Sequence, residues 1–393
     1  MLIMKQLRIP AVYMRGGTSK GVFFHAHDLP TQPSERDQIL LRVMGSPDPY
    51  GKQIDGMGGA SSSTSKVVII NKSTRPNCDI DYLFGQVSVA NAVIDWSGNC
   101  GNLSSAVGPF AISEGLVKVP PNGLATVRIW QANIQKEIIA HVPMQDGEVL
   151  ELGDFNLDGV TFPAAEVRLE FLNPGGDSGQ ESGPILPTGK PKDLLLVPHL
   201  GQFEVSYINA GLPTIFIQAS ALGLQGTELQ ADVNFHPELL HTIELIRSHG
   251  AVVMGLAKTP EEATSSRPHT PKLCFVAKPA DYTSADGKLI ESHQIHLLAR
   301  VISMGVMHHA MTGTGAVAIA AAAAIPGNLV SECMNQPQSN SVIFGHPSGI
   351  LQVGAKAIFT NKEWVVTQVN MSRTARRIME GFVRIPKPSP LSK

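Results

Sequence analysis

The chain has 393 residues, of which 43% are hydrophobic and 16% charged, and its formal net charge is −2. This length exceeds what one hydrophobic core usually supports, so we expect two domains in a compact globular protein. The near-neutral charge, without a run of Lys or Arg, argues against a nucleic-acid-binding protein.

Targeting and redox features are also absent from the sequence. The first residues, MLIMKQLRIP, lack the apolar stretch of a secretory signal, and the longest near-apolar run, 315–326, is too short to span a bilayer. Four widely spaced cysteines form no CxxC pair, so neither a disulfide framework nor a zinc site is predicted. We predict a soluble, cytoplasmic protein that does not act at a membrane.

The predicted elements alternate between strands and helices along the chain. Residues 8–14 and 21–24 flank the glycine-rich segment MRGGTSKG and predict a strand, a turn and a strand. A helix is predicted over 33–44, with two carboxylates in its first turn, and an apolar helix from Asn99 onward. A loop rich in Gly, Pro, Ser and Asp, 173–192, is predicted to connect two domains. Further strands are predicted at 64–70, 81–89, 126–131, 136–143 and 167–172.

The second half of the chain repeats landmarks of the first half in the same order. YMRGGTSKGVFF, from Tyr13, matches YINAGLPTIFI, from Tyr207; SKVVII matches PKLCFV, and CGNLSSAVGPFAI matches TGTGAVAIAAAAAI. The last two matches pair Lys66 with Lys272 and Cys100 with Thr312. We infer two homologous α/β halves that face each other across a cleft.

Cys100 stands at the predicted start of the helix in the first half. The first amides of a helix have no acceptor within it and carry partial positive charge, so such an end binds carboxylates and favours a thiolate. A buried cysteine that only packs at a turn is the alternative. The matching TGTG segment favours a functional site, because two helix ends facing one cleft would hold an anion. The candidate residues at these ends are Asn99, Gly101, Asn102, Thr312 and Gly313.

Lys66 follows a run of hydroxyl residues and opens an apolar strand. Partial desolvation there would lower the pKa of an amine toward that of a general base, whereas a solvated lysine at a strand edge is the more common case. Lys272, its counterpart in HTPK, would add positive charge from the other half. The remaining candidates for binding an acidic substrate are Arg15, Gly17, Thr18, Ser19, Ser63, Thr64, Ser65, Ser303, Gly305 and His308.

Two other kinds of site are not predicted. The glycine-rich segment has neither the GxxxxGK[ST] nor the GxGxxG spacing of nucleotide-binding loops. His308 and His309 have no neighbouring carboxylate and no HExxH motif, so no metal is predicted.

Eight segments, in this order, closely resemble the PrpF family of 2-methylaconitate cis–trans isomerases, which act in the methylcitrate cycle of propionate catabolism. The resemblance covers essentially the whole chain. It is carried by MRGGTSKGVFF, GSPDPYGKQIDGMGGASSSTSK, DYLFGQV, DWSGNCGNL, RIWQAN, NAGLPTIF, HTPK and FGHPSG.

The resemblance implies a diaminopimelate epimerase-like fold of the α/β (α+β) class. Such a fold has two pseudo-symmetric domains, each a mostly antiparallel sheet wrapped around a central helix, with the active site in the cleft between them. We expect domains at 1–185 and 190–380, and allow for the tail, about 380–393, packing with the first domain.

The resemblance also implies a cofactor-independent isomerase of a small unsaturated tricarboxylate. Lys66 would remove and return an allylic proton, and Cys100 would line the pocket; whether the thiol transfers protons stays open. Epimerases of this superfamily use two cysteines, but Thr312 stands at the second position here, which disfavours two-thiol racemisation. The alternatives are a related acid (4-oxalomesaconate, methylitaconate or aconitate) or a non-catalytic tricarboxylate-binding protein. A homo-oligomer is compatible with the sequence.

Overall fold

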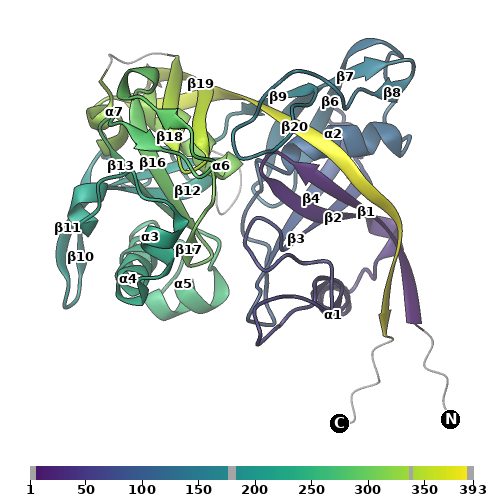
Figure 1. Ribbon diagram of the computed structural model, residues 1–393, viewed down its shortest axis with the longest axis horizontal. Helices are drawn as coiled ribbons and strands as arrows, with labels where there is room; N and C mark the ends of the chain where they lie inside the picture. Colours follow the sequence, from purple (N-terminus) through teal and green to yellow (C-terminus); the bar gives the residue numbers. More distant parts are fainter. Residues whose placement is uncertain (1–5, 176–182, 336–339, 387–393) are drawn as a thin grey trace.

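The computed structural model describes residues 6–175, 183–335 and 340–386, which form two lobes joined by a long strand (Figure 1). The first lobe contains β1 (Gln6–Gly16), β2 (Ser19–His25), α1 (Pro33–Met44), β3 (Lys66–Lys72), β4 (Ile80–Val87), β5 (Ile94–Asp95), α2 (Ser104–Ser113), β6 (Gly123–Gln131), β7 (Lys136–Gln145), β8 (Glu148–Val149) and β9 (Glu166–Leu172). The predicted helix and strands of this half are therefore confirmed to within a few residues.

The second lobe repeats the alternation of strands and helices. It contains β10 (Asp193–Val197), β11 (Gly201–Ala210), β12 (Leu212–Gln218), α3 (Gln230–Asn234), α4 (Pro237–Val253), α5 (Pro260–Ser266), β13 (Lys272–Ala277), β14 (Tyr282–Thr283), β15 (Leu289–Ile290), β16 (Leu297–Ser303), β17 (Val306–Met307), α6 (Gly313–Ala323), α7 (Leu329–Cys333), β18 (Ser341–His346), β19 (Gly349–Thr360) and β20 (Glu363–Pro386). Short 3-10 helices lie at η1 (Ala26–Asp28), η2 (Ala219–Leu222) and η3 (Ser292–Gln294).

The predicted repeat is confirmed by the way the strands pair. In the first lobe β1–β2 is antiparallel, β2–β3 parallel, β3–β4 antiparallel and β4–β6 parallel. In the second lobe β11–β12, β12–β13, β13–β16 and β16–β18 follow the same alternation. The register agrees as well, because Val22 lies opposite Val67 and Ile215 lies opposite Leu273, the matching pair.

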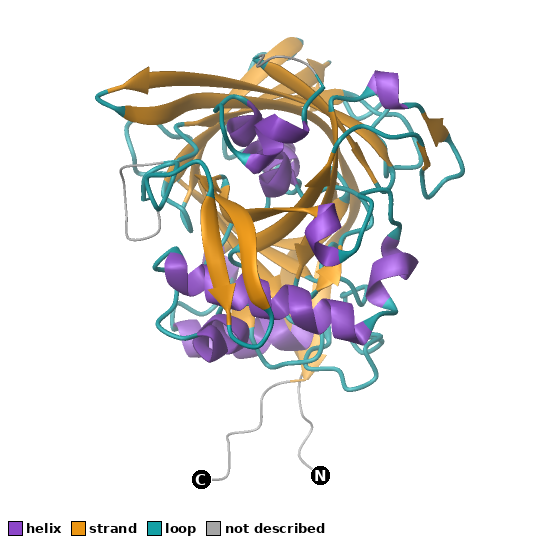
Figure 2. Ribbon diagram, turned by 90° about the vertical axis from the view of Figure 1, so that its left-hand side faces the viewer, coloured by secondary structure: helices purple, strands orange, loops and turns teal. Residues whose placement is uncertain are grey.

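A wholly buried helix runs through each lobe. Residues 104–111 of α2 and all of α6 are buried, so neither helix has a polar face and each must be surrounded by other elements. The curved sheet supplies that surrounding, and Figure 2 shows a helix enclosed by the strands of one lobe. The strands thereby fix both helices, and with them the residues at the helix N-termini.

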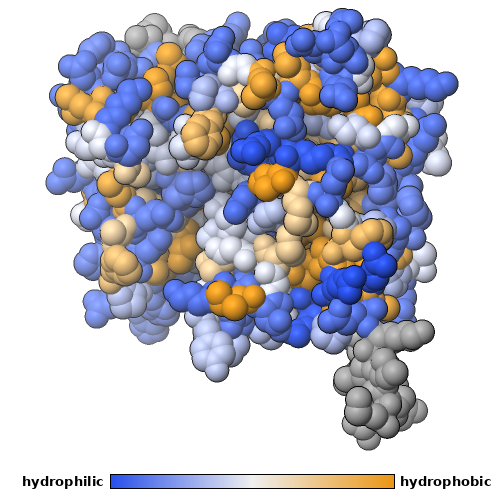
Figure 3. Space-filling model, turned by 45° about the vertical axis from the view of Figure 1, so that its right-hand side comes forward, coloured by the Kyte–Doolittle hydropathy of each residue, from blue (hydrophilic) through white to orange (hydrophobic). Residues whose placement is uncertain are grey.

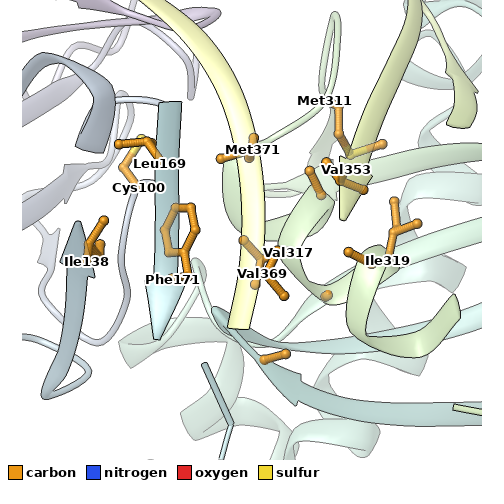
Figure 4. Packing of buried hydrophobic residues seen from close by; sticks show 14 of the residues in the cluster. Cys100, Ile138, Leu169, Phe171, Met311, Val317, Ile319, Val353, Val369 and Met371 are labelled. Atoms are coloured by element: carbon orange, nitrogen blue, oxygen red, sulfur yellow. The ribbon is translucent and has the colours of Figure 1, made fainter. Parts of the chain in front are cut away.

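Strand β20 connects the lobes. It pairs with β19 of the second lobe and β9 of the first, and residues 375–386 then pair with β1. Figure 4 shows Val369 and Met371 of β20 between Phe171 of the first lobe and Val317 of the second. One continuous hydrophobic core therefore contains both buried helices. Of the predicted C-terminal tail, 387–393 lies outside the described residues.

Two boundaries differ from the prediction or are only partly visible. Helix α2 begins at Ser104 rather than directly after Cys100, because 101–103 form a tighter turn in which the amide of Ser105 donates to the carbonyl of Asn102 (3.2 Å). The connection predicted at 173–192 contains no helix or strand among its described residues, and 176–182 lies outside them.

The outer surface mixes polar and hydrophobic side chains. On the face shown in Figure 3, hydrophobic residues lie in small separate groups among hydrophilic ones. No helix in the described part of the chain is long and apolar enough to span a bilayer.

Candidate active site

The N-termini of α2 and α6 are built in the same way. The carbonyl of Cys100 accepts from the amide of Ser104 (2.9 Å), and its Sγ accepts from the amide of Leu103 (3.4 Å). In α6 the carbonyl of Thr312 accepts from Ala316 (2.9 Å), and its Oγ1 accepts from Gly315 (3.0 Å). Thr312 is the N-cap of α6, whereas Cys100 opens the turn that precedes α2, so the two residues hold matching positions with similar hydrogen bonds.

The two helix ends touch. A Cβ atom built on Gly101 would lie 2.7 Å from the carbonyl carbon of Gly313, and one on Gly313 would lie 2.3 Å from that of Gly101. Only glycine allows this approach of backbone to backbone. The partial positive charges of both helices therefore converge on one place, where anions are favoured.

Lys66 opens β3 beside this place, and its side chain is only 5% exposed. Its Nζ donates to Oε1 of Gln86 (2.5 Å) and lies 5.0 Å from the ring centroid of Phe84. Burial lowers the pKa of Lys66, and the charge and hydrogen bond of Cys100 oppose that change. The amine is therefore easier to deprotonate than an exposed lysine, as a general base must be.

Lys272 opens β13 in the equivalent position of the second lobe and is 1% exposed. Its Nζ donates to Oγ of Ser303 (3.0 Å) and lies 3.4 Å from Nδ1 of His269. Burial, together with the positive charge of Lys66, lowers the pKa of Lys272 to about 7. The charge of Lys66 thus acts on Lys272 across the boundary between the lobes.

Two buried histidines complete the polar surroundings of the lysines. Burial, with positive charges nearby, holds the pKa of His269 and His308 well below 6.5, so both are neutral at pH 7. Nδ1 of His308 accepts from the amide of Ala310 (3.0 Å), which places its proton on Nε2. The neutral rings therefore add no positive charge to the lysine pair.

The cationic side chains at the site form no ion pairs with the described residues. The buried carboxylate of Asp95 raises the pKa of Lys272, but its oxygens accept from Ser97 and from the amide of His269. Among the described residues, no carboxylate lies within 4.0 Å of the side-chain nitrogens of Lys66, Lys272 or Arg373. Arg373 is buried and donates from Nε to Oδ1 of Asn102 (3.0 Å). Asn99 is fully buried, and neither its Oδ1 nor its Nδ2 has a partner in the described part of the chain. Such groups are costly to bury and match a negatively charged, hydrogen-bonding ligand.

An outer cleft of about 780 Å³ is lined by several predicted residues, but Lys66, Lys272 and Cys100 are not part of its wall. Ser63, three residues before Lys66, lies in its wall, with Oγ 3.4 Å from Nδ1 of His309. Thr18 accepts from Nδ2 of Asn102 (2.9 Å), two residues beyond Cys100. The other predicted residues in the cleft wall are Arg15, Gly17, Ser19 and Thr64.

Of three further predicted residues, two form hydrogen bonds with other protein groups and one lies in an exposed turn. Ser65 is buried, and its hydroxyl accepts from Nε2 of Gln53 (2.7 Å). Arg15 donates to the carbonyl and hydroxyl of Thr374 (3.0 and 2.8 Å). Gly305 is exposed in the turn between β16 and β17, and a Cβ built on it would have no atom within 4 Å.

Comparisons with known proteins identify the family of the chain. A family model described as PrpF protein matches residues 6–386. The chain belongs to the PrpF family. A relative from Shewanella oneidensis named 2-methyl-aconitate isomerase is 58% identical over 98% of each chain. The crystal structure of methylitaconate-delta-isomerase matches 99% of each chain with a TM-score of 0.75 and 38% identity.

The fold extends beyond the PrpF family. A probable proline racemase from Agrobacterium radiobacter matches 98% of this chain, and 94% of its own, with a TM-score of 0.55 and 12% identity. At this identity the likeness shows the fold alone. The predicted fold class, two pseudo-symmetric α/β lobes of the proline racemase and diaminopimelate epimerase kind, is confirmed.

The sequence prediction missed three residues at the site of this PrpF-family chain: Gln86, His269 and Arg373. Gln86 and His269 lie in DYLFGQV and HTPK, two segments that carry the family resemblance, but no spacing indicated their contacts with the lysines. Arg373 is 271 residues from Asn102 in the chain, so no local signal could have placed it there.

Proposed function

We propose that this protein is a cofactor-independent isomerase that interconverts the cis and trans forms of 2-methylaconitate by proton transfer. The observation that carries the proposal is the pair of buried lysines, Lys66 and Lys272, at two converging helix N-termini without carboxylate partners. A small tricarboxylate supplies the negative charge that this arrangement lacks.

In the proposed reaction Lys66 acts as the base. Its neutral amine takes a proton from the methylene group beside a carboxylate, so that a C–H bond breaks and an N–H bond forms. The electron pair spreads over the allylic system and the carboxylate, and the former double bond gains single-bond character. After rotation the Lys66 ammonium returns the proton to carbon. The reaction consumes no co-reactant.

The surrounding groups would stabilise the additional negative charge of this intermediate. We assign Lys272, the helix-end amides at Gly101 and Gly313, and the unpartnered amide of Asn99 to the substrate carboxylates. Preorganised donors in a buried site are the most effective kind of stabilisation, and loss of one typically costs roughly 3 kcal/mol. We keep Cys100 as a wall of the pocket beside Lys66.

The choice of substrate is based on the relatives. The relative named 2-methyl-aconitate isomerase is 58% identical, whereas the solved methylitaconate-delta-isomerase is 38% identical. We therefore favour 2-methylaconitate, with methylitaconate as the second candidate because the same proton shift serves both acids. The proposal includes a cytoplasmic location and no requirement for a metal or cofactor.

Proton NMR of 2-methylaconitate incubated with the protein in D₂O tests the proposal. We expect the two geometric isomers to interconvert and deuterium to enter the methylene position. Lys66→Ala should abolish both signals, while Lys72→Ala, at the exposed far end of the same strand, should leave them unchanged. Binding of the acid without exchange or isomerisation in the unaltered protein would overturn the proposal in favour of a non-catalytic binding protein.

A further inference from the structure

Gln86 is the direct neighbour of Lys66 in the sheet. It lies on β4, opposite Lys66 on the antiparallel strand β3, and its side chain is fully buried. Residues paired in this way have their Cβ atoms only about 5 Å apart, so their side chains meet. The Nζ–Oε1 distance of 2.5 Å reflects this pairing.

The orientation of the Gln86 amide is determined by its other contacts. Its Nε2 donates to the backbone carbonyls of Ser62 (3.1 Å) and Ser65 (3.0 Å). Carbonyl oxygens only accept hydrogen bonds, so the NH₂ group must face them and Oε1 must face Lys66. Both protons of the amide nitrogen are used, which leaves the side chain no alternative orientation with equal bonding.

This fixed acceptor has two consequences for an amine that must act as a base. It takes one N–H of Lys66, so the lone pair of the neutral amine points away from Gln86. It is also uncharged, so it does not hold the amine as an ammonium ion, as a carboxylate in the same place would. Cys100, in the turn before α2, is the titratable group whose charge and hydrogen bond raise the pKa of this amine. Ser303, the acceptor for Lys272, is a hydroxyl that can rotate and imposes no such direction.

We propose that Gln86 is a positioning residue that directs the Lys66 amine and, by being uncharged, does not hold it as an ammonium ion. This inference depends on the proposed function, in which Lys66 is the base. Gln86 also connects Lys66 to the run of hydroxyl residues at 61–65. The carbonyls of Ser62 and Ser65 orient its amide, and Ser63 and Thr64 of the same run line the outer cleft.

The test compares pH profiles of kcat for 2-methylaconitate isomerisation in wild type, Gln86→Glu and Gln86→Met. The carboxylate introduced by Gln86→Glu would pair with the Lys66 ammonium, so we expect kcat at pH 7 to fall at least tenfold, with the acidic limb of the profile moved up by about 1–3 pH units. Activity should therefore recover as the pH rises. Gln86→Met removes the acceptor without adding charge, so kcat should fall at every pH while the limb stays or moves down.

Gln131→Glu is the matched control. Gln131 is also fully buried, lies on the adjacent strand β6 and has no contact with Lys66 among the described residues, so its variant should leave the limb in place. Thermal unfolding of each variant separates loss of fold from loss of activity.

The outcomes distinguish the role of Gln86 from the proposed function. Suppose that wild type is active and the acidic limb of the pH profile keeps its position in both Gln86 variants; Gln86 is then only structural and the inference is wrong. The same conclusion follows if the limb moves equally in Gln131→Glu. If wild type neither isomerises the acid nor exchanges its protons, the proposed function fails, and the inference with it.

Discussion

The two lobes have the same strand pairing and the same helix ends, yet the side chains at their meeting point differ. The first lobe contributes Cys100 and Lys66, whose amine donates to the amide oxygen of Gln86. The second contributes Thr312 and Lys272, whose amine contacts the hydroxyl of Ser303 and the neutral ring of His269. A symmetric backbone therefore supplies two equivalent positive ends for anion binding. In the proposed mechanism the asymmetric side chains assign Lys66 to act as the base and Lys272 to bind the substrate.

Substitution by arginine separates these two roles and should give the largest effect. Arginine keeps the positive charge but does not deprotonate in proteins, so it can bind an anion but cannot act as a base. We expect Lys66→Arg to lower kcat for 2-methylaconitate by about 10³-fold, within the range of general base catalysis. Lys272→Arg should raise KM about tenfold and change kcat little.

Steady-state kinetics of both variants, with thermal unfolding to confirm folding, provides the check. Equal losses of kcat in the two variants would mean that both lysines exchange protons with the substrate. A larger loss for Lys272→Arg than for Lys66→Arg would reverse the assignment.

The contact between the helix ends should be intolerant of any added atom. A Cβ on Gly313 would lie 2.3 Å from the carbonyl carbon of Gly101, and backbone cannot yield as a flexible side chain can. We expect Gly313→Ala to lower the free energy of unfolding by about 1–3 kcal/mol through overpacking. Urea denaturation measures this change. Gly183→Ala, where the nearest atom would be 3.8 Å away, should change stability by under about 0.5 kcal/mol.

The buried charge of Lys272 should make stability depend on pH. The unfolded chain keeps this proton to about pH 10.4, while the folded protein loses it from about pH 7, so the unfolded state binds more protons between these values. Stability of wild type should then rise with pH in this window, by at most about 1.4 kcal/mol per unit from this group. Lys272→Met should lack that rise.

The measurement is urea denaturation of both proteins at pH 7, 8 and 9 in a buffer free of polycarboxylates. We expect the free energy of unfolding of wild type to increase relative to that of Lys272→Met as the pH rises. Parallel pH dependence in the two proteins would show that Lys272 keeps its ordinary pKa in the folded state.

The two lobes and the paired positions of the lysines could be predicted from the sequence, whereas most side-chain contacts at the site could not. Strand periodicity and the ordered repeat gave the two lobes and paired Lys66 with Lys272, because such patterns follow from local geometry and duplication. The contact of Gln86 with Lys66 depends on strand register, and that of Arg373 with Asn102 on the path of β20 between the lobes. Neither is encoded in local spacing. The hydrogen bond that Ser65 accepts from Gln53 is a further contact that its place in a hydroxyl run did not indicate.

Substitution of Cys100 and of Thr312 should give the smallest effect and addresses the role of the thiol. Serine at position 100 keeps a small side chain that can accept from the amide of Leu103, so the helix end is preserved. If Lys66 alone transfers the proton, Cys100→Ser should keep kcat within about tenfold of wild type, and Thr312→Ser, its equivalent in the second lobe, within about twofold. Kinetics in H₂O and D₂O provide the check. A serine hydroxyl is a far weaker acid than a thiol, so a hundredfold loss of kcat in Cys100→Ser alone, with KM unchanged, would show that the first lobe supplies two proton-transfer groups.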